Sequence, residues 1–194
     1  MRLFAAVLPP PGAATELEPV IDRLRALPGA DRLRWTGRPG WHFTLAFMGE
    51  VDTAVLPELR TRLGRAAHRT DPFPLRFHGG GEFGGRVLWA GAAGGIDGLR
   101  LLAERSYAAA ARSGVPLEEH RRYRAHLTIA RSRVTTDLGA FLAALAPFEG
   151  TPWEVTRLAL VRSNLPTGGT PGEQPRYETV DSWPLGAGPV LPPG

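Results

Sequence analysis

Two short segments of the sequence share the same order of histidine, threonine and alanine. The first spans residues 42–47 (HFTLAF) and the second spans residues 126–131 (HLTIAR), so their histidines are 84 positions apart (126 − 42). An imidazole exchanges protons near neutral pH, and a threonine hydroxyl donates a hydrogen bond to an oxygen atom. Two such pairs could perform acid–base chemistry on a phosphate group, with one imidazole accepting a proton while the other donates one.

Both segments are apolar enough to be strands, and strand geometry explains the spacing of their polar residues. Side chains alternate between the two faces of a strand, so His42 shares a face with Thr44, and His126 shares one with Thr128. If a pseudo-twofold axis relates the two strands, the two pairs face one another across a groove. An in-line displacement at phosphorus requires this arrangement, because attack and departure occur on opposite sides of the phosphorus atom. The residues alone do not assign which histidine is the acid.

Arg131 ends the second segment and could complete a phosphate site, since a planar guanidinium matches an oxyanion. Strict alternation puts Arg131 on the face of Leu127 and Ile129, away from Thr128. We therefore expect its side chain to reach a phosphate only if the strand ends or bulges near Ala130.

The elements that must position these residues alternate irregularly along the chain. Alternation and apolar runs predict strands at residues 3–8, 33–35, 43–48, 75–77, 86–90, 123–130, 153–161 and 177–183. Helical spacing predicts helices near residues 17–27, 55–66, 99–112 and 138–145. We expect the first helix to start with a capping box at Thr15 and Glu18, and to hold Pro19 in its first turn. The glycine-rich residues 79–85 are interpreted as a flexible hairpin loop, and residues 163–175 as a mobile loop. The lack of a regular βαβ order favours an α+β fold with antiparallel sheets.

Composition limits the chemistry that the chain could perform. Its 194 residues, 43% of them hydrophobic, suit one domain or two small lobes with a shared core. Cysteine is absent, which excludes thiol nucleophiles, zinc–thiolate sites and redox motifs. All 23 cationic residues are arginine, which excludes a phosphate-binding loop that depends on lysine. The net charge of +4 suits a polyanionic partner without proving one.

The chain has no segment that predicts membrane insertion or export. No apolar run approaches the ~20 residues that cross a bilayer. The apolar run at residues 3–8 stops at Pro9, short of a signal peptide, so we expect a cytoplasmic protein. We also expect one domain over residues 1–185, a disordered tail over residues 186–194, and a monomer.

With these motifs, the chain resembles the two-histidine (2H) phosphoesterases, and within them the RNA 2′,3′-cyclic phosphodiesterase branch, also called the 2′-5′ RNA ligase family. The resemblance covers residues 1–185 and is carried by both histidine motifs and by short segments around them: residues 2–6 (RLFAA), 34–35 (RW), 47–51 (FMGEV), 83–84 (FG), 87–89 (VLW), Tyr123, Arg131, and Ser163, Tyr177 and Trp183 near the end. One His-x-Thr motif is a weak signal, whereas two in equivalent halves with Arg131 in place are a strong one. Ala125 departs from the family, which usually has proline there, and this puts the entry into the second strand in doubt.

The resemblance implies both a fold and roles for particular residues. The implied fold is bilobal and pseudo-twofold, with two antiparallel sheets that line a central cleft and with helices outside. His42 is implied to protonate the leaving ribose oxygen, and His126 to activate water. Phosphate oxygens are implied to be bound by Thr44, Thr128 and Arg131. The implied reaction is metal-independent and cofactor-free hydrolysis of an RNA 2′,3′-cyclic phosphate end to a 2′-phosphomonoester, reversible as 2′-5′ ligation.

Three further residues could contact RNA. Tyr123 and Phe47 could stack a nucleobase, or could simply pack in the core. Arg124 lies in a charged run just before His126 and could attract RNA phosphates, although such runs are usually solvated.

Two other functions stay open. One is a related activity on small cyclic nucleotides or 2′,5′-linked oligonucleotides, and the other is a non-catalytic module that binds RNA ends. The presence of both histidines and both threonines argues against the second.

Overall fold

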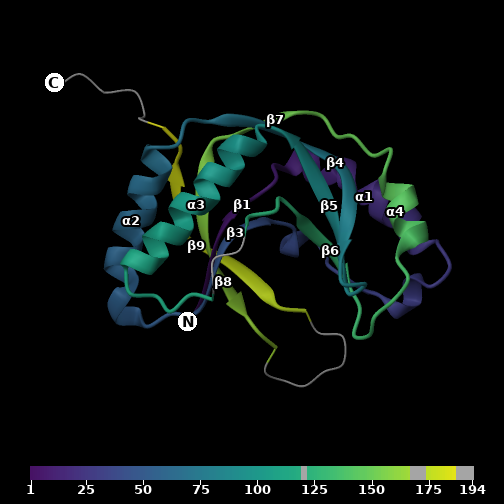
Figure 1. The fold of residues 1–194 in the computed structure, drawn as a ribbon, viewed down its shortest axis with the longest axis horizontal. Helices are drawn as coiled ribbons and strands as arrows, with labels where there is room; N and C mark the ends of the chain where they lie inside the picture. Colours follow the sequence, from purple (N-terminus) through teal and green to yellow (C-terminus); the bar gives the residue numbers. More distant parts are fainter. Residues whose placement is uncertain (119–121, 167–173, 187–194) are drawn as a thin grey trace.

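Nine strands and four α-helices are formed by the residues that the structure, a computed structural model, describes: 1–118, 122–166 and 174–186 (Figure 1). The strands are β1 (Arg2–Val7), β2 (Arg34–Trp35), β3 (Phe43–Glu50), β4 (Phe73–Phe83), β5 (Val87–Gly94), β6 (Leu127–Arg131), β7 (Trp153–Val155), β8 (Arg157–Asn164) and β9 (Arg176–Pro184). The helices are α1 (Pro11–Arg25), α2 (Leu56–His68), α3 (Ile96–Arg112) and α4 (Gly139–Leu145), with short 3-10 helices at Ala30–Arg32, Arg38–Gly40 and Thr53–Val55. The tail expected to be disordered lies outside the described residues from residue 187 onward, as do residues 167–173 of the loop expected to be mobile.

The strands form one antiparallel sheet that consists of two halves. Their order is β7-β4-β5-β6-β3-β1-β8-β9, with β2 beside β6. The two halves meet where β3 and β6 pair at a single position, Phe43 with Leu127. Beyond this position β3 and β6 diverge, and β2 pairs with the end of β6 instead. The predicted α+β fold with antiparallel sheets is therefore confirmed, and the two sheets are joined edge to edge.

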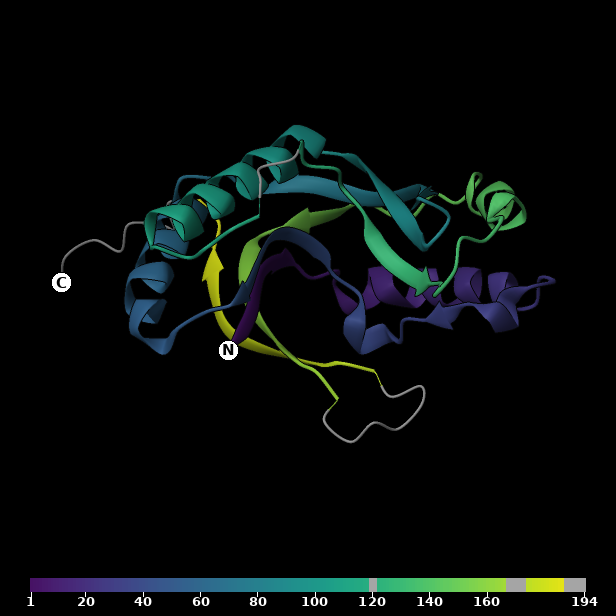
Figure 2. The ribbon, with the colours of Figure 1, turned by 60° about the horizontal axis from the view of Figure 1, so that its bottom comes forward.

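The helices cover the outer face of the sheet. On each half, one of the covering helices follows in sequence a strand that belongs to the other half. Helix α1 follows β1 but packs beside α4 on the second half, whereas α3 follows β5 but packs with α2 against β3 (Figures 1 and 2). A hydrogen bond of 2.8 Å from the backbone N–H of Thr151 to the Glu16 carboxylate attaches α1 to the second half. In the part of the chain that the structure describes, no helix has both the length and the apolar character that a membrane span needs.

Strand alternation divides the first half of the sheet between two apolar clusters. Leu3, Ala5 and Val7 of β1 point into the main core under the helices. Their neighbours on the other face join a small second cluster that consists of Phe4, Ala6, Ala159 and Val161, with Tyr177 packed against it. The inner face of the sheet, which points away from the helices, therefore carries a small apolar cluster that is separate from the main core.

The first helix begins earlier than the sequence predicted. Pro11 occupies its first turn, where a proline loses no hydrogen bond and its fixed φ angle suits a helix. The predicted capping box is wrong, because Thr15 lies inside the helix and donates a 2.9 Å hydrogen bond to the Pro11 carbonyl. Pro19 also lies in the helix interior rather than in the first turn.

Three other predicted elements differ from the structure. Most of residues 79–85 belong to β4 rather than to a flexible loop, because the missing side chain of Gly81 lets the Trp89 ring lie against the strand: a Cβ atom there would be 2.1 Å from that ring. The predicted strand 153–161 is two strands, since the chain crosses at Thr156 from β4 in one half to β1 in the other. The predicted strand 123–130 begins only at Leu127.

Candidate active site

The two histidine motifs lie side by side at the centre of the sheet. Phe43 and Leu127, which are paired across β3 and β6, are fully buried, so the residues that flank them point to the inner face. The same register places the histidine of each motif opposite the threonine of the other, His42 opposite Thr128 and His126 opposite Thr44. The two histidines are therefore diagonal neighbours across this pair. Both His-x-Thr pairs lie on the inner face, where the two halves of the sheet meet.

A β-bulge follows the threonine in each motif. Relative to its neighbouring strand, β3 has an extra residue at Leu45 and β6 has an extra residue at Ile129. A bulge turns two successive side chains to the same face, and in each strand the residue at the bulge and the alanine after it are both buried. The alternation is reset, so Phe47 and Arg131 emerge on the inner face with the histidines. The bulge thus supplies the condition under which Arg131 was expected to reach a phosphate.

His42 is enclosed by two aromatic rings and is held from the backbone. Its ring centroid lies 4.5 Å from that of Phe4 and 5.1 Å from that of Tyr177, which meets it edge-on. Burial and, to a smaller extent, the positive charges of Arg131 and His126 together lower the pKa of His42 to about 4, against a backbone hydrogen bond at Gly40 that acts to raise it. The free protein therefore keeps this imidazole neutral at neutral pH.

His126 has matching surroundings on the other strand. Its ring meets Phe83 edge-on at 4.9 Å and Trp89 at 6.2 Å, and its Nδ1 lies 2.7 Å from the carbonyl oxygen of Arg124. Because a carbonyl only accepts, Nδ1 carries the proton and Nε2 is left with a lone pair. Burial lowers the pKa of His126, helped by the charges of Arg131 and Arg124 and opposed by the hydrogen bond to the Arg124 backbone. This tautomer suits a proton acceptor.

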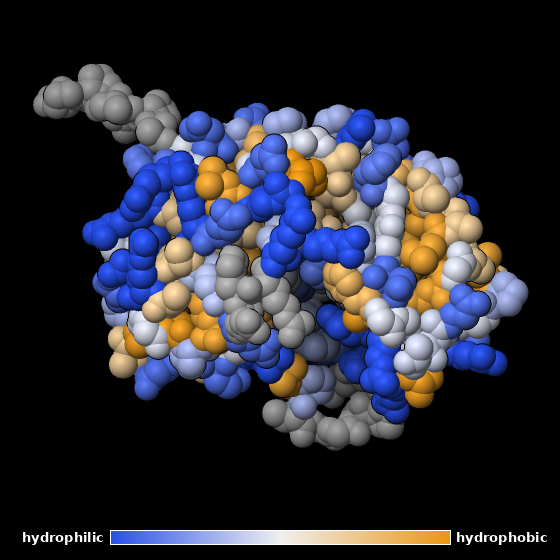
Figure 3. Space-filling view, viewed as in Figure 1, coloured by the Kyte–Doolittle hydropathy of each residue, from blue (hydrophilic) through white to orange (hydrophobic). Residues whose placement is uncertain are grey.

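The inner face around the two imidazoles is strongly cationic. The guanidinium of Arg124 lies 5.9 Å from the centroid of Phe83 and 5.5 Å from that of Trp89. Figure 3 shows a hollow between the two halves, with strongly hydrophilic side chains at its rim. Among the residues that the structure describes, no three His, Asp or Glu side chains gather closely enough to hold a metal ion. The face is thus suited to an anion.

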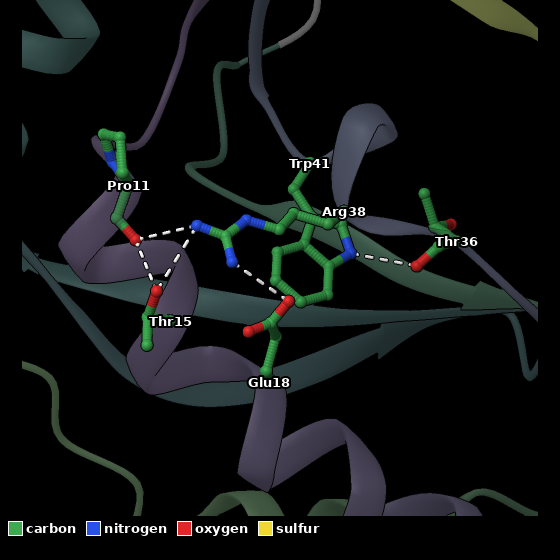
Figure 4. A network of polar contacts seen from close by, with 6 residues as sticks. All are labelled: Pro11, Thr15, Glu18, Thr36, Arg38 and Trp41. Atoms are coloured by element: carbon green, nitrogen blue, oxygen red, sulfur yellow. Dashed lines mark hydrogen bonds and ion pairs between the residues drawn. The ribbon is translucent and has the colours of Figure 1, made fainter.

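The segment that leads into His42 is fixed to α1 by Arg38 (Figure 4). The Arg38 guanidinium donates to the Pro11 carbonyl at 3.0 Å and forms a 3.0 Å ion pair with Glu18. Just before His42, the buried Trp41 donates its indole N–H to the Thr36 carbonyl at 2.9 Å. These contacts position the start of β3 relative to the helix of the other half.

The remaining predicted residues have different surroundings. Arg124 lies beside His126, and Phe47, which is 46% exposed, lies under the guanidinium of Arg2 at 4.8 Å. Tyr123 packs against the main core with its hydroxyl buried. Four rings that enclose the imidazoles were not among the predicted site residues: Phe4, Phe83, Trp89 and Tyr177. Strand alternation alone could have put Phe4 on an inner face, but the neighbour it would meet depends on long-range pairing.

Comparisons with known proteins agree on one family. A family model described as 2'-5' RNA ligase superfamily matches residues 9–166. A protein from Aquifex aeolicus named RNA 2',3'-cyclic phosphodiesterase is 28% identical over 159 residues, which make up 79% of this chain and 82% of that protein. A protein of the same name from Geobacillus stearothermophilus is 28% identical over 156 residues, covering 78% of this chain but 47% of its own length.

Solved structures share the fold over almost the whole chain. E. coli LigT in its apo form has a TM-score of 0.74 at 26% identity, covering 95% of this chain and 97% of LigT. LigT complexed with 3'-AMP has a TM-score of 0.74 at 28% identity, with the same coverage of 95% and 97%. TT0787 of Thermus thermophilus has a TM-score of 0.74 at 26% identity, covering 95% of this chain and 98% of TT0787.

Proposed function

Because this chain belongs to the 2′-5′ RNA ligase superfamily, we propose that it hydrolyses the 2′,3′-cyclic phosphate at the end of an RNA to a 2′-phosphomonoester, without a metal ion. Two relatives named RNA 2',3'-cyclic phosphodiesterase support this reaction. A LigT structure that holds 3'-AMP supports a nucleotide ligand. The observation that carries the proposal is the antiparallel pairing of the two His-x-Thr motifs about Phe43 and Leu127.

In the proposed reaction, the cyclic phosphate lies above the inner face between the two imidazoles. The Nε2 atom of His126 accepts a proton from water as the water oxygen bonds to phosphorus. The bond between phosphorus and the 3′ oxygen breaks, and His42 donates a proton to that oxygen, which leaves a 2′-phosphate. The hydroxyls of Thr44 and Thr128 and the guanidinium of Arg131 bind the non-bridging oxygens, whose charge grows in the transition state. In ligation the 5′ hydroxyl of a second RNA takes the place of water, and the two histidines keep these roles. They exchange roles in the reverse reaction, in which the 3′ hydroxyl re-forms the cyclic phosphate and the 5′ oxygen leaves.

The low pKa of His42 must rise before this residue can act as the acid. In the free protein, burial and the charges of Arg131 and His126 hold its pKa at about 4. A phosphate monoanion beside the ring favours the imidazolium and offsets those charges. Substrate binding therefore raises the pKa of His42, so that the imidazole takes up from solvent the proton that the leaving oxygen needs.

The test is hydrolysis of an RNA oligomer with a 2′,3′-cyclic phosphate end, with the position of the product phosphate read by ³¹P NMR. Since general acid–base catalysis contributes about 10²–10⁴-fold, we expect His42→Ala and His126→Ala each to lose at least about a hundredfold in kcat. We expect full activity in EDTA. His68→Ala is the matched control, because His68 is exposed at the end of α2.

Activity of either variant within about tenfold of the wild type would overturn the assignment. Loss of activity in EDTA would show a metal-dependent reaction instead. Tight binding of a 2′-phosphate oligonucleotide without hydrolysis of the cyclic end would show a binding module.

A further inference from the structure

Three arginines from different strands act electrostatically on the phenol of Tyr177. Burial raises the pKa of Tyr177, and the positive charges of Arg131, Arg2 and Arg34 each act to lower it. They belong to β6, β1 and β2, which are far apart in the sequence. Arg34 lies directly opposite Arg131 in the pairing of β2 with β6, and like charges at opposed positions destabilise a sheet. An anion beside them would relieve this repulsion.

The scissile phosphate accounts for only part of this charge. A cyclic phosphodiester carries one negative charge. In the proposed reaction its non-bridging oxygens are bound by Arg131 and the two threonine hydroxyls. Arg2 adds a positive charge that this phosphate does not need. A second phosphate close to the first would match it.

Arg2 is held in place by an aromatic ring rather than by an acid. Its guanidinium lies 4.8 Å from the centroid of the Phe47 ring. Glu50, which is opposite Arg2 in the register, forms a 2.9 Å ion pair with the amino group of Met1 instead. No carboxylate forms an ion pair with Arg2 within the described ranges. Phe47 occupies in the first motif the position that Arg131 occupies in the second, so each motif brings one guanidinium to the inner face.

A groove rich in arginine lies beside Arg2. It has a volume of about 630 Å³ and is lined by three arginines, Arg2, Arg162 and Arg176, together with polar side chains. The one carboxylate in its lining, Glu50, is paired with the amino group of Met1. This volume lies in the range of sites that hold a small-molecule ligand, which is about 300–1,000 Å³. The groove therefore has room for a nucleotide, and its charge suits a phosphate chain.

The direction of the proposed reaction connects this groove to the substrate. The ribose that keeps the phosphate lies on the side of His42, because His42 protonates its 3′ oxygen, and Tyr177 packs against that same imidazole. The rest of an RNA chain is attached through the 5′ oxygen of this ribose. We propose, on the basis of the proposed function, that Arg2, positioned by Phe47 and assisted by Arg34, binds the phosphodiester that precedes the terminal nucleotide. The protein is then adapted to the end of an RNA chain rather than to a cyclic mononucleotide.

The test compares three substrates: adenosine 2′,3′-cyclic phosphate, the dinucleotide ApA with a 2′,3′-cyclic end, and the same dinucleotide with an uncharged methylphosphonate linkage. We expect the wild type to prefer the charged dinucleotide in kcat/KM. Arg2→Gln should lower kcat/KM for that substrate at least about tenfold, the effect of one charge-assisted hydrogen bond, and should change the other two less than about twofold. Phe47→Leu should act in the same direction, mainly through KM, because it only positions Arg2.

Arg65→Gln is the matched control, since it removes the same charge from an exposed position on α2 and should leave the substrate preference unchanged. Equal effects of Arg2→Gln on all three substrates, or no effect on any, would overturn the inference while leaving hydrolysis intact.

Failure of the proposed function gives a different result, namely no hydrolysis of any substrate by the wild type. Calorimetric titration with adenosine 2′-phosphate and with the dinucleotide that carries a 2′-phosphate then tests Arg2 by binding alone. Arg2→Gln should weaken the dinucleotide about tenfold more than the mononucleotide, and equal weakening would reject the second phosphate site.

Discussion

Phe43 and Leu127 are paired across β3 and β6, and both side chains are completely buried. An antiparallel pair has a local twofold axis, and here the axis passes between these two residues. It relates the two histidines, the two threonines and the two bulges to one another. The apolar pair under the sheet thus fixes the geometry of the polar groups above it.

This relationship predicts that Phe43→Ala lowers stability sharply. The ring also stacks on Phe77, with 5.8 Å between centroids, and the truncation leaves a cavity where the two halves meet. We expect a loss of about 3–5 kcal/mol in the free energy of unfolding, measured by urea denaturation. Val134→Ala, at a position that is 64% exposed, should change it by less than about 0.5 kcal/mol. A loss below about 1 kcal/mol for Phe43→Ala would contradict this role.

The lowered pKa values predict an acid-shifted pH profile of kcat/KM, which reports the free enzyme. In the proposed reaction the active form has neutral His126 and protonated His42, so the rate should fall at low pH as His126 gains a proton and at high pH as His42 loses one. Both pKa values lie below the usual 6.5, that of His42 at about 4. The bell-shaped profile should therefore be centred below 6.5. The kcat profile should lie at higher pH, because bound phosphate raises both pKa values. A kcat/KM profile centred above neutrality would refute this.

Arg131 is predicted to depress the pKa of both imidazoles in the free protein. Its positive charge opposes protonation of His42 and of His126. Arg131→Gln should therefore raise both pKa values, which NMR titration of the imidazole resonances measures without any substrate. In Arg65→Gln, which removes an exposed arginine of α2, both imidazoles should titrate as in the wild type. Unchanged values for His42 and His126 in Arg131→Gln would show that Arg131 lies too far away to act.

Gly81 is predicted to be intolerant of any side chain. A Cβ atom would lie 2.1 Å from the ring of Trp89, which packs against His126. Gly81→Ala should shift this ring, lower kcat about tenfold through His126, and cost about 1–3 kcal/mol of stability. Gly12→Ala in α1 is the control, because nothing lies within 4 Å of its added Cβ atom and alanine favours a helix. Equal kcat for Gly81→Ala and the wild type would reject the role of Trp89 as a support for His126.

Local patterns in the sequence predict the two histidine–threonine pairs, but not the residues that surround them. The two His-x-Thr motifs, their strands and the burial of Phe43, Leu45, Leu127 and Ile129 follow from alternation and repetition. The face on which Arg131 lies does not, because the bulge at Ile129 exists only relative to β5. The ring of Tyr177 reaches His42 through strand pairings between distant segments, which no local pattern encodes.

The incorrect predictions have the same origin. Residues 153–161 alternate as one strand would, but their two ends pair with different halves of the sheet. The glycines at positions 80 and 81 suggest a loop when the sequence is considered alone. In the structure they lie in β4, where Gly80 packs closely against the backbone of Trp89 and Gly81 against its ring. The predicted capping box at Thr15 is wrong because the helix already begins at Pro11, four residues earlier.

The exchange of helices between the halves has a consequence for biosynthesis. Strand β3 is covered by α3, which ends at Arg112. Strand β1 pairs on its second edge with β8, which ends at Asn164. The N-terminal portion of a nascent chain therefore leaves the ribosome with apolar strands still uncovered. Folding must wait for nearly the entire polypeptide, and a chaperone that shields the early segments should increase the yield.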